Sequence, residues 1–391
     1  MPEIPAIQND LREAGLDGWL FYDFRGRDPL AQRILGLPAG MRTRRWFYFV
    51  PAKGEPRKLV HKIEAASLES LPGERFFYSA QSELEKNLKK LFGRAKRVAM
   101  QYSPKNAIPY VSMVDAGTVE LVRAAGCKVV SSADLIQKYE AAWTPAQLES
   151  HLAAGIAIDR IVREGFQYAA KCVREKRAIT EYDIKRWMLE RFGEAQITAD
   201  EGPDIAVNEN ASDPHYQAEP GRSAPVREGD LLLLDVWGKT RSPESVYYDI
   251  TWVGFLGPKV PEKHAKVFRI VREARDRAIE FVKKGVASGE PPQGCQVDRV
   301  AREHITKAGY GKYFFHRTGH SIGQNVHGNG ANMDGLETHD VRRVIPRTCF
   351  SIEPGIYLPE FGVRSEVNVY VGEREARVTG AIQTEILPLL A

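Results

Sequence analysis

Short apolar runs alternate with helical patterns over the first 140 residues of the chain. Runs that are rich in aromatic and β-branched residues, and that are bounded by glycine, proline or charge, predict strands. These runs are residues 18–24, 45–51, 57–63, 97–100 and 127–132. Segments that repeat apolar residues every three or four positions predict helices. These segments are residues 82–92 and 114–126. The alternation predicts an α/β domain whose sheet is largely buried.

The pattern changes where a strong helix start signal follows the last of these strands. Thr144 suits an N-cap, and Gln147 three positions later completes a capping box. We expect a long amphipathic helix from there to about Lys176. Its apolar stripe is expected to contain Leu148, Leu152, Ile156 and Ile161. We therefore expect two domains, one of residues 1–140 and one of residues 141–391.

Strands and helices also alternate in the second domain. Helical periodicity predicts a helix that starts after Thr180 and runs to Phe192, and two more over residues 261–285 and 296–309. Strands are predicted over residues 231–238 and 246–254. Their apolar runs indicate that both faces of each strand are mostly covered. The predicted fold class is α/β, of the mixed α+β kind.

Composition and charge narrow the class of protein. The 391 residues are 43% hydrophobic and 27% charged, an ordinary balance for a globular protein. The net charge of +4 is too small to argue for nucleic acid or an anionic membrane as a partner. The four cysteines form no CxxC pair, which fits a reducing compartment. The sequence also lacks a signal-peptide pattern and a long apolar run, so we expect a soluble cytoplasmic protein.

The most informative polar residues are carboxylates inside apolar strand patterns. They are Asp235 in LLLLDVW, Asp249 in VYYDITW, Glu353 in FSIEPGIY and Glu366 in VRSEVNVYV. Burying an ionised carboxylate costs several kcal/mol unless it is paired or bound to a metal. Each one alone more often lies at a strand end, in water or beside an arginine. Four together, with no lysine in the same strands, indicate two divalent cations that balance the charge.

Three histidines sharpen this prediction, because His316, His320 and His327 fall within twelve residues. A lone histidine is usually a core or surface residue, but these stand among glycines, which let the backbone approach a ligand closely. One imidazole with four carboxylates suits Mn, Co, Fe or Zn. The chain has no HExxH, P-loop, GxGxxG or GxSxG motif, which argues against single-zinc proteases, nucleotide-phosphate sites and serine hydrolases.

With these motifs the sequence resembles the pita-bread metallopeptidases, which include methionine aminopeptidase, aminopeptidase P and prolidase (Xaa-Pro dipeptidase). The resemblance rests on HRTGHSIG, SIEPGIY and GVRSE and covers residues 145–391. It implies a C-terminal pita-bread domain, preceded by the creatinase-like N-terminal domain that proline-specific members add. It also implies two divalent metal ions, Mn foremost, with Co, Zn or Fe possible. The implied ligands are Asp235, Asp249, His320, Glu353 and Glu366.

The resemblance further implies roles in the hydrolysis of an Xaa-Pro bond. Glu353 is expected to act as the general base. His327, in NVH, is expected to contact the scissile carbonyl and stabilise its oxyanion. His215, in DPHY, and His316 are expected to shape the proline side of the substrate pocket.

Arg364 and Tyr357 complete the expected site. Arg364 shares a strand face with Glu366, so its guanidinium is expected to orient ligand carboxylates. Tyr357 is expected to contact substrate, or alternatively to be a packed strand aromatic. Two segments depart from the family pattern: residues 239–246 read as an insertion in the hairpin between the two aspartates, and the polar loop 328–343 is expected to alter substrate access.

We expect an Xaa-Pro dipeptidase that acts on dipeptides or short proline-containing peptides. Aminopeptidase P is the nearest alternative, and a hydrolase or lyase of the same fold with a non-peptide substrate is another. A catalytically inactive binding module disagrees with the full set of expected ligands. The resemblance implies a homodimer. No nucleic-acid or membrane partner is expected, because the basic stretch at residues 42–47 is too short.

Overall fold

The computed structural model describes residues 3–38 and 42–391. The chain divides into two compact units, Met1–Glu140 and Ala141–Ala391, and each has its own core. None of the helices in the described parts of the chain combines the length and the apolar character that crossing a bilayer requires.

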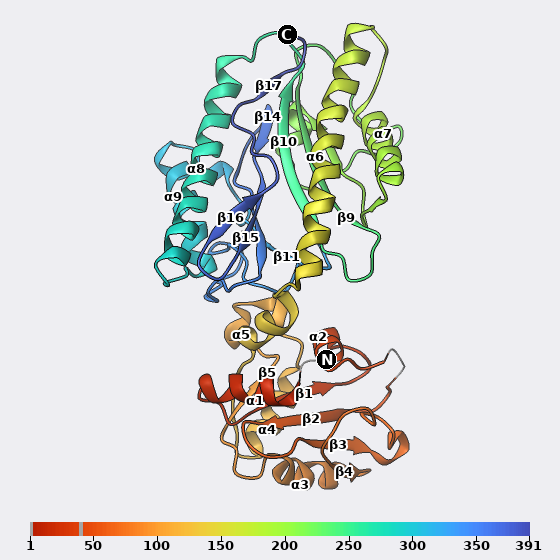
Figure 1. Cartoon of the computed structure of the whole chain (residues 1–391), viewed down its shortest axis with the longest axis vertical. Helices are drawn as coiled ribbons and strands as arrows, with labels where there is room; N and C mark the ends of the chain where they lie inside the picture. The colour runs from red at the N-terminus through yellow and green to blue at the C-terminus, as the bar shows by residue number, and fades with distance from the viewer. Residues whose placement is uncertain (1–2, 39–41) are drawn as a thin grey trace. The chain divides into compact units, whose positions relative to one another are not determined.

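The N-terminal unit contains a six-stranded sheet in the order β4-β3-β2-β1-β5-β6 (Figure 1). Its strands are β1 (Gly18–Asp23), β2 (Trp46–Pro51), β3 (Arg57–His61), β4 (Glu74–Tyr78), β5 (Arg97–Met100) and β6 (Lys128–Ser131). β2 runs antiparallel to β1 and β3, while the β3–β4, β1–β5 and β5–β6 pairs are parallel. The five strands expected from the sequence are thus confirmed, and β4 is an additional one.

Helices cover both faces of this sheet, as expected for a buried sheet. They are α1 (Ile4–Glu13), α2 (Pro29–Ile34), α3 (Gln81–Phe92), α4 (Ala116–Ala124) and α5 (Ala133–Ile136). Trp19 and Phe21 of β1 pack in one core cluster with α1 and α2. Leu20 and Tyr22 point to the opposite face and pack with α3 and α4. Successive side chains of a strand alternate between faces, so one short strand contributes to both clusters.

The C-terminal unit begins with the long helix α6 (Pro145–Arg174), which starts with the expected capping box. The expected apolar stripe is wrong in part, because Ile156 is 77% exposed and Leu152 is 37% exposed. The buried face instead carries small residues next to large ones. At Gly155 a Cβ would lie only 2.7 Å from the Tyr248 ring, so the helix approaches the sheet closely there. Hydrophobicity alone misplaces such a face, since glycine and alanine contribute little to the pattern.

A central hairpin of β9 (Leu231–Thr240) and β10 (Tyr248–Phe255) organises this unit. Three short strands join its sheet: β7 (Ile197–Thr198), β8 (Asp204–Val207) and β17 (Leu387–Pro388). Helices α6 and α7 (Glu181–Glu194) pack on one face, against Leu232, Leu234 and Val236 of β9. Leu231 and Leu233 point the other way, into the second core cluster.

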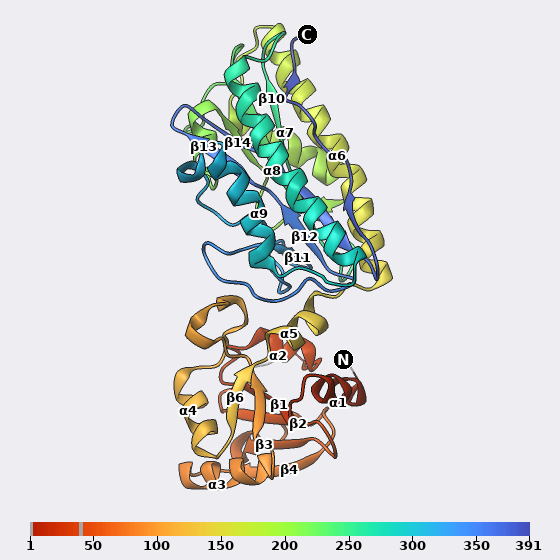
Figure 2. The ribbon, with the colours of Figure 1, turned by 90° about the vertical axis from the view of Figure 1, so that its left-hand side faces the viewer.

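That second cluster joins the hairpin to the remaining elements of the unit. They are helices α8 (Glu262–Ala287) and α9 (Gly294–Lys307) and strands β11 (Ser321–Ile322), β12 (Cys349–Ile352), β13 (Gly355–Leu358), β14 (Phe361–Arg364), β15 (Val367–Val371) and β16 (Ala376–Thr379). Helices α8 and α9 lie side by side (Figure 2). Strands β11, β12, β15 and β16 form a sheet, and β13 and β14 form a separate hairpin. The expected helices and strands of this unit are confirmed, with bounds that differ by a few residues.

Candidate metal centre

Asp235 and Asp249 lie on the same face of the β9–β10 hairpin. The register pairs Asp235 with Thr251 and Asp249 with Trp237. Residues that are directly opposite in an antiparallel pair share a face, as do residues two apart on one strand. Both aspartates and Thr251 therefore point the same way. The segment 239–246 falls at the end of β9 and in the turn beyond it, so it leaves the register at the aspartates intact.

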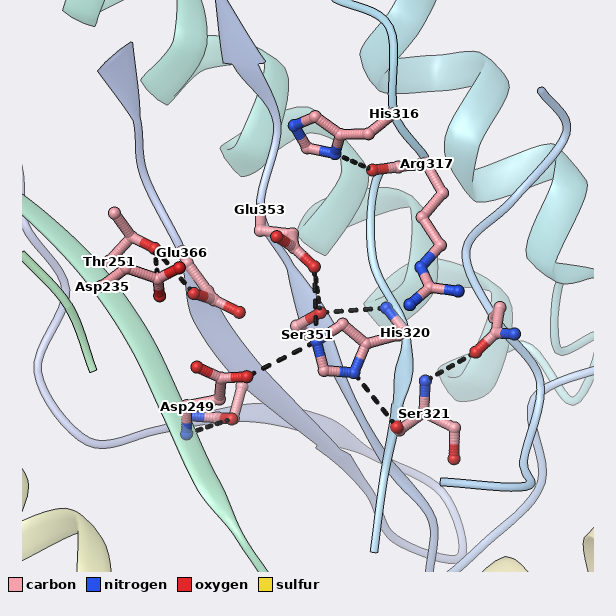
Figure 3. Close-up of polar contacts among 12 residues, drawn as sticks. Asp235, Asp249, Thr251, His316, Arg317, His320, Ser321, Ser351, Glu353 and Glu366 are labelled. Carbon is pink, nitrogen blue, oxygen red and sulfur yellow. Dashed lines mark hydrogen bonds and ion pairs between the residues drawn. The ribbon is translucent and has the colours of Figure 1, made fainter. Parts of the chain in front are cut away.

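The remaining three expected ligands lie next to strand ends, so Glu353 and Glu366 are not inside strands as their apolar surroundings suggested. His320 directly precedes β11, Glu353 lies between β12 and β13, and Glu366 lies between β14 and β15. His320 Nε2 is 3.4 Å from Asp249 Oδ2 and 3.4 Å from Glu353 Oε1 (Figure 3). Asp249, His320 and Glu366 offer ligand atoms that all lie within 4.8 Å of one another. Segments that are distant in the sequence thus converge on one buried cluster.

The chemistry of this cluster fits a divalent cation. Asp249 Oδ1 is buried and has no hydrogen-bond partner. Burial and the neighbouring carboxylates raise the pKa of both Asp249 and Glu366 well above the ordinary range. A positive ion would remove this mutual repulsion and would give the unpartnered oxygen a ligand. Oxygen-rich sites with one imidazole suit hard or borderline metals rather than thiolate-selecting ones.

The ring of His320 is oriented as a metal-binding imidazole needs to be. Its Nδ1 lies 3.2 Å from the carbonyl oxygen of Ser321, which only accepts hydrogen bonds. A proton on Nδ1 would satisfy this carbonyl and leave the Nε2 lone pair, on the side of Asp249 and Glu353, for a metal ion. A carbonyl partner on the far ring nitrogen is typical of histidines that bind metals.

Arg364 and Thr251 form hydrogen bonds with the carboxylates of Asp235 and Glu366. Arg364 Nη2 donates to Asp235 Oδ2 at 2.5 Å, and Nε donates to Thr251 Oγ1 at 3.0 Å. The Thr251 hydroxyl lies 2.9 Å from Asp235 Oδ1 and 2.8 Å from Glu366 Oε2 (Figure 3). The sequence pattern did not single out Thr251, although strand alternation from Asp249 places it on the same face. Its hydroxyl links two of the expected ligand carboxylates to one guanidinium.

His316 and Tyr357 form a second layer of contacts beyond Arg364. His316 Nδ1 lies 2.6 Å from the carbonyl oxygen of Arg317, and Nε2 lies 2.7 Å from the Tyr357 hydroxyl. That hydroxyl also accepts a hydrogen bond from Arg364 Nη1 at 2.9 Å. Burial, followed by the charge of Arg364, lowers the pKa of His316 to about 3, so the ring is neutral. Both ring nitrogens of His316 have protein partners, and in Figure 3 the ring lies apart from the carboxylates.

His327 and His215 lie on the exposed side of the cluster. The His327 ring is nearly perpendicular to the His320 ring, with centroids 4.4 Å apart. The His320 imidazole, followed by burial, lowers the pKa of His327, and His215 contributes to the same effect. The structure therefore brings His327 next to His320 and places His215 within electrostatic range of it. His215 itself is exposed on the segment between β8 and β9.

Helix α9 fixes the segment that carries His316 and His320. Asp298 Oδ1 accepts hydrogen bonds from the Thr318 N–H at 3.0 Å and from its hydroxyl at 2.8 Å. Arg302 forms an ion pair with Asp298 and donates to the carbonyl oxygens of Phe314 and His316. This pair was not predictable from the sequence, because an acidic and a basic residue four apart on a helix are an ordinary surface pattern.

The polar loop 328–343 is anchored by buried charge. Asp340 and Arg342 form an ion pair with both side chains at most 1% exposed. Arg342 also donates to the carbonyl oxygens of Asn329 and Gly330 at 2.7 Å. Asn332 Oδ1 accepts a hydrogen bond from the N–H of Ser321, the residue after His320. This loop therefore packs against the strand that positions His320.

Residues 156–373 match the model of metallopeptidase family M24, and the chain belongs to this family. The Xaa-Pro dipeptidase of Lactobacillus helveticus is 32% identical over 229 residues, which are 57% of this chain and 55% of that protein. The chain thus spans about half the length of the curated relatives it matches.

Solved structures match over almost the whole chain. The dipeptidase PepE from Mycobacterium ulcerans has a TM-score of 0.71 at 23% identity, covering 99% of this chain and 96% of that one. The prolidase from Thermococcus sibiricus has a TM-score of 0.63 at 21% identity, covering 98% of each chain. These likenesses confirm the expected fold, in which a pita-bread domain follows an α/β domain.

Proposed function

We propose that this protein is a metallopeptidase that hydrolyses Xaa-Pro bonds, and that dipeptides are its main substrates. The observation that carries the proposal is the buried cluster of Asp249, His320 and Glu366, whose ligand atoms lie within 4.8 Å of one another and which includes an unpartnered Asp249 oxygen. Glu353 lies beside His320, and the Thr251 hydroxyl joins Asp235 to Glu366. The name of the L. helveticus relative, an Xaa-Pro dipeptidase, supports the choice of substrate.

We assign the five converging side chains as the ligands of two divalent ions, with Mn as the leading candidate. These ligands are Asp235, Asp249, His320, Glu353 and Glu366. When bound, such ions supply Lewis acidity and lower the pKa of a water molecule so that it attacks near neutral pH. Four ligand carboxylates match the charge of two divalent ions, which supports a pair rather than a single ion.

Glu353 is proposed to move the proton. Its side chain is 15% exposed, whereas that of Asp249, the other carboxylate beside His320, is 6% exposed. Burial raises the pKa of Glu353, which brings it closer to the range in which a carboxyl group both accepts and releases a proton. Glu353 would accept the proton of the attacking water and deliver it to the proline nitrogen. That nitrogen has no hydrogen of its own and requires a proton before it leaves.

The histidines divide between substrate contact and support. The pKa of His327 is lowered, so this ring is neutral and can donate an N–H to the oxygen of the scissile carbonyl as negative charge develops there. His215, which is exposed, is proposed to border the proline side of the substrate. His316 has no free ring nitrogen, so we propose that it acts through Tyr357 and Arg364 and offers substrate only its ring face.

Hydrolysis of matched peptides tests this proposal. Chelator-treated protein would be supplied in turn with Mn, Co or Zn and given Gly-Pro, Met-Pro and the tripeptide Gly-Pro-Gly. Metal-dependent cleavage of the dipeptides alone is the expected result. Cleavage of the tripeptide at comparable rates would indicate aminopeptidase P activity instead. Cleavage of neither, in protein that retains metal, would contradict peptidase activity and favour a non-peptide substrate.

We further propose a homodimer that works in the cytoplasm. The resemblance to proline-specific pita-bread enzymes supports the dimer. The four cysteines, all present as free thiols, agree with a reducing compartment. Sedimentation equilibrium tests the dimer directly, and a mass equal to one chain across micromolar concentrations would contradict it.

A further inference from the structure

A further carboxylate lies beside the metal centre on β8. The β8–β9 register pairs Asp204 directly with Asp235, so the two side chains point to the same face. Ala206, two residues further along β8, lies in the core cluster on that face, whereas Ile205 lies in the cluster on the opposite face. The alternation along β8 therefore places Asp204 on the side of the hairpin that carries the ligands.

Asp204 is buried without an ion-pair partner among the described residues. It is 8% exposed, and its Oδ1 is buried with no hydrogen-bond partner. Within residues 3–38 and 42–391, no lysine, arginine or histidine nitrogen forms an ion pair with it. Lys185 and Arg364 supply the positive charge that acts on Asp204, and Arg364 is already engaged with Asp235. An ionised carboxylate in this position is costly unless a cation reaches it.

Asp204 offsets the positive charge that Arg364 adds to the proposed ligand set. The four proposed ligand carboxylates have the charge that balances two divalent ions. The positive charge of Arg364 then has no counterpart among them. Asp204 supplies one more negative charge next to the Arg364–Asp235 pair. Within the set of proposed ligands and Arg364, the five carboxylates then equal two divalent ions and one guanidinium, and Lys185 acts on Asp204 from outside this set.

We propose that Asp204 is an additional carboxylate ligand of the metal centre, serving the ion that Asp235 binds. The inference rests on the proposed metal centre and extends its ligand set from five residues to six. It also explains why an acidic residue occupies a strand position whose neighbours Ile205 and Ala206 are ordinary core residues.

Metal affinity of an isosteric variant tests the proposal without reference to activity. Metal-free protein would be titrated with Mn²⁺ against a competing chelator, comparing the wild type with Asp204→Asn. Glu201→Gln is the matched control. It removes the same charge from an exposed side chain three residues before Asp204. Asp249→Asn is the control for loss of a ligand assigned under the proposed function.

The expected result is that Asp204→Asn binds one of its two ions about tenfold or more weakly, while Glu201→Gln binds both as the wild type does. Equal affinity of Asp204→Asn and the wild type for both ions would overturn the inference. If affinity is equal and KM for Lys-Pro rises, the carboxylate serves a cationic part of the substrate, which also overturns it. A wild type that binds no ion would instead contradict the proposed function itself.

Thermal unfolding gives an independent readout. Without metal, Asp204→Asn should be at least as stable as the wild type, because a buried unpaired charge is gone. The rise in Tm on adding Mn²⁺ should be smaller in the variant. If Asp204→Asn and Asp204→Ser both fail to fold without metal, Asp204 has a structural role and the inference is wrong.

Discussion

Arg364 Nη2 donates to Asp235 Oδ2 at 2.5 Å, and this contact fixes a carboxylate on β9 with a guanidinium from the end of β14. Nε of the same guanidinium contacts Thr251 and Nη1 contacts Tyr357. One side chain therefore determines the orientation of a proposed ligand and joins it to the residues around it.

Replacing Arg364 by lysine should weaken metal binding by about ten- to a hundredfold. Lysine keeps the positive charge, but it cannot contact Asp235, Thr251 and Tyr357 at once as the planar guanidinium does. Chelator competition with Mn²⁺ measures the effect. Arg299→Lys, on an exposed position of α9, is the control, and equal affinities for the two variants would refute this role.

Thr251→Val should lower metal affinity by about tenfold, while Thr251→Ser should stay close to the wild type. Valine keeps the shape of threonine but removes the hydroxyl shared by Asp235, Glu366 and Arg364. Loss of an outer contact of this kind typically costs about ten- to a hundredfold in affinity or activity. If serine and valine have the same effect, the hydroxyl is not the important group.

Asp298→Ala should destabilise the protein by about 3 kcal/mol, because it leaves Arg302 and the buried Thr318 without their partner. It should also reduce kcat, since the segment with His316 and His320 loses its anchor. Urea unfolding and steady-state kinetics measure the two effects. Glu303→Ala removes only an exposed pair on the same helix and should change stability by less than about 1 kcal/mol.

His151 should make the protein less stable as the pH falls from about 6.5 to about 4. Burial lowers its pKa to about 4 in the folded protein, whereas an unfolded histidine titrates near 6.5. In this interval the unfolded chain binds a proton that the folded protein does not, so stability falls by up to about 3 kcal/mol. Above pH 6.5 His151 makes no contribution to the pH dependence of stability.

The test is urea unfolding of the wild type and His151→Asn at pH 7.5 and 4.5. Asparagine offers an N–H to the Tyr247 carbonyl, which His151 Nδ1 contacts at 2.6 Å, but it does not titrate. The free energy of unfolding should therefore fall less steeply with pH in the variant. Parallel pH profiles would contradict the assignment.

The fold was predictable where burial appears directly as apolar runs. β9 and β10 have such runs, and the hairpin formed where the sequence indicated. β4 was not predictable in this way, because it is an edge strand with mostly exposed or half-buried side chains. The α6 stripe was misplaced because the close contact at Gly155 depends on Tyr248, which is distant in the sequence.

The site was predictable only for residues inside distinctive motifs. Thr251 and Asp298 act through contacts that folding creates, and neither lies in a motif. Asp204 is a candidate ligand because it lies opposite Asp235, and that pairing depends on the β8–β9 register. A short strand such as β8 carries too little pattern for its register to be inferred from the sequence.

The most direct test of the account is to titrate metal-free protein with Mn²⁺ while measuring Met-Pro hydrolysis. We expect no hydrolysis without metal, a rise that levels off near two equivalents per chain, and no rise for Asp249→Asn. Hydrolysis that persists in metal-free protein, or that is unaffected by Asp249→Asn, would contradict it.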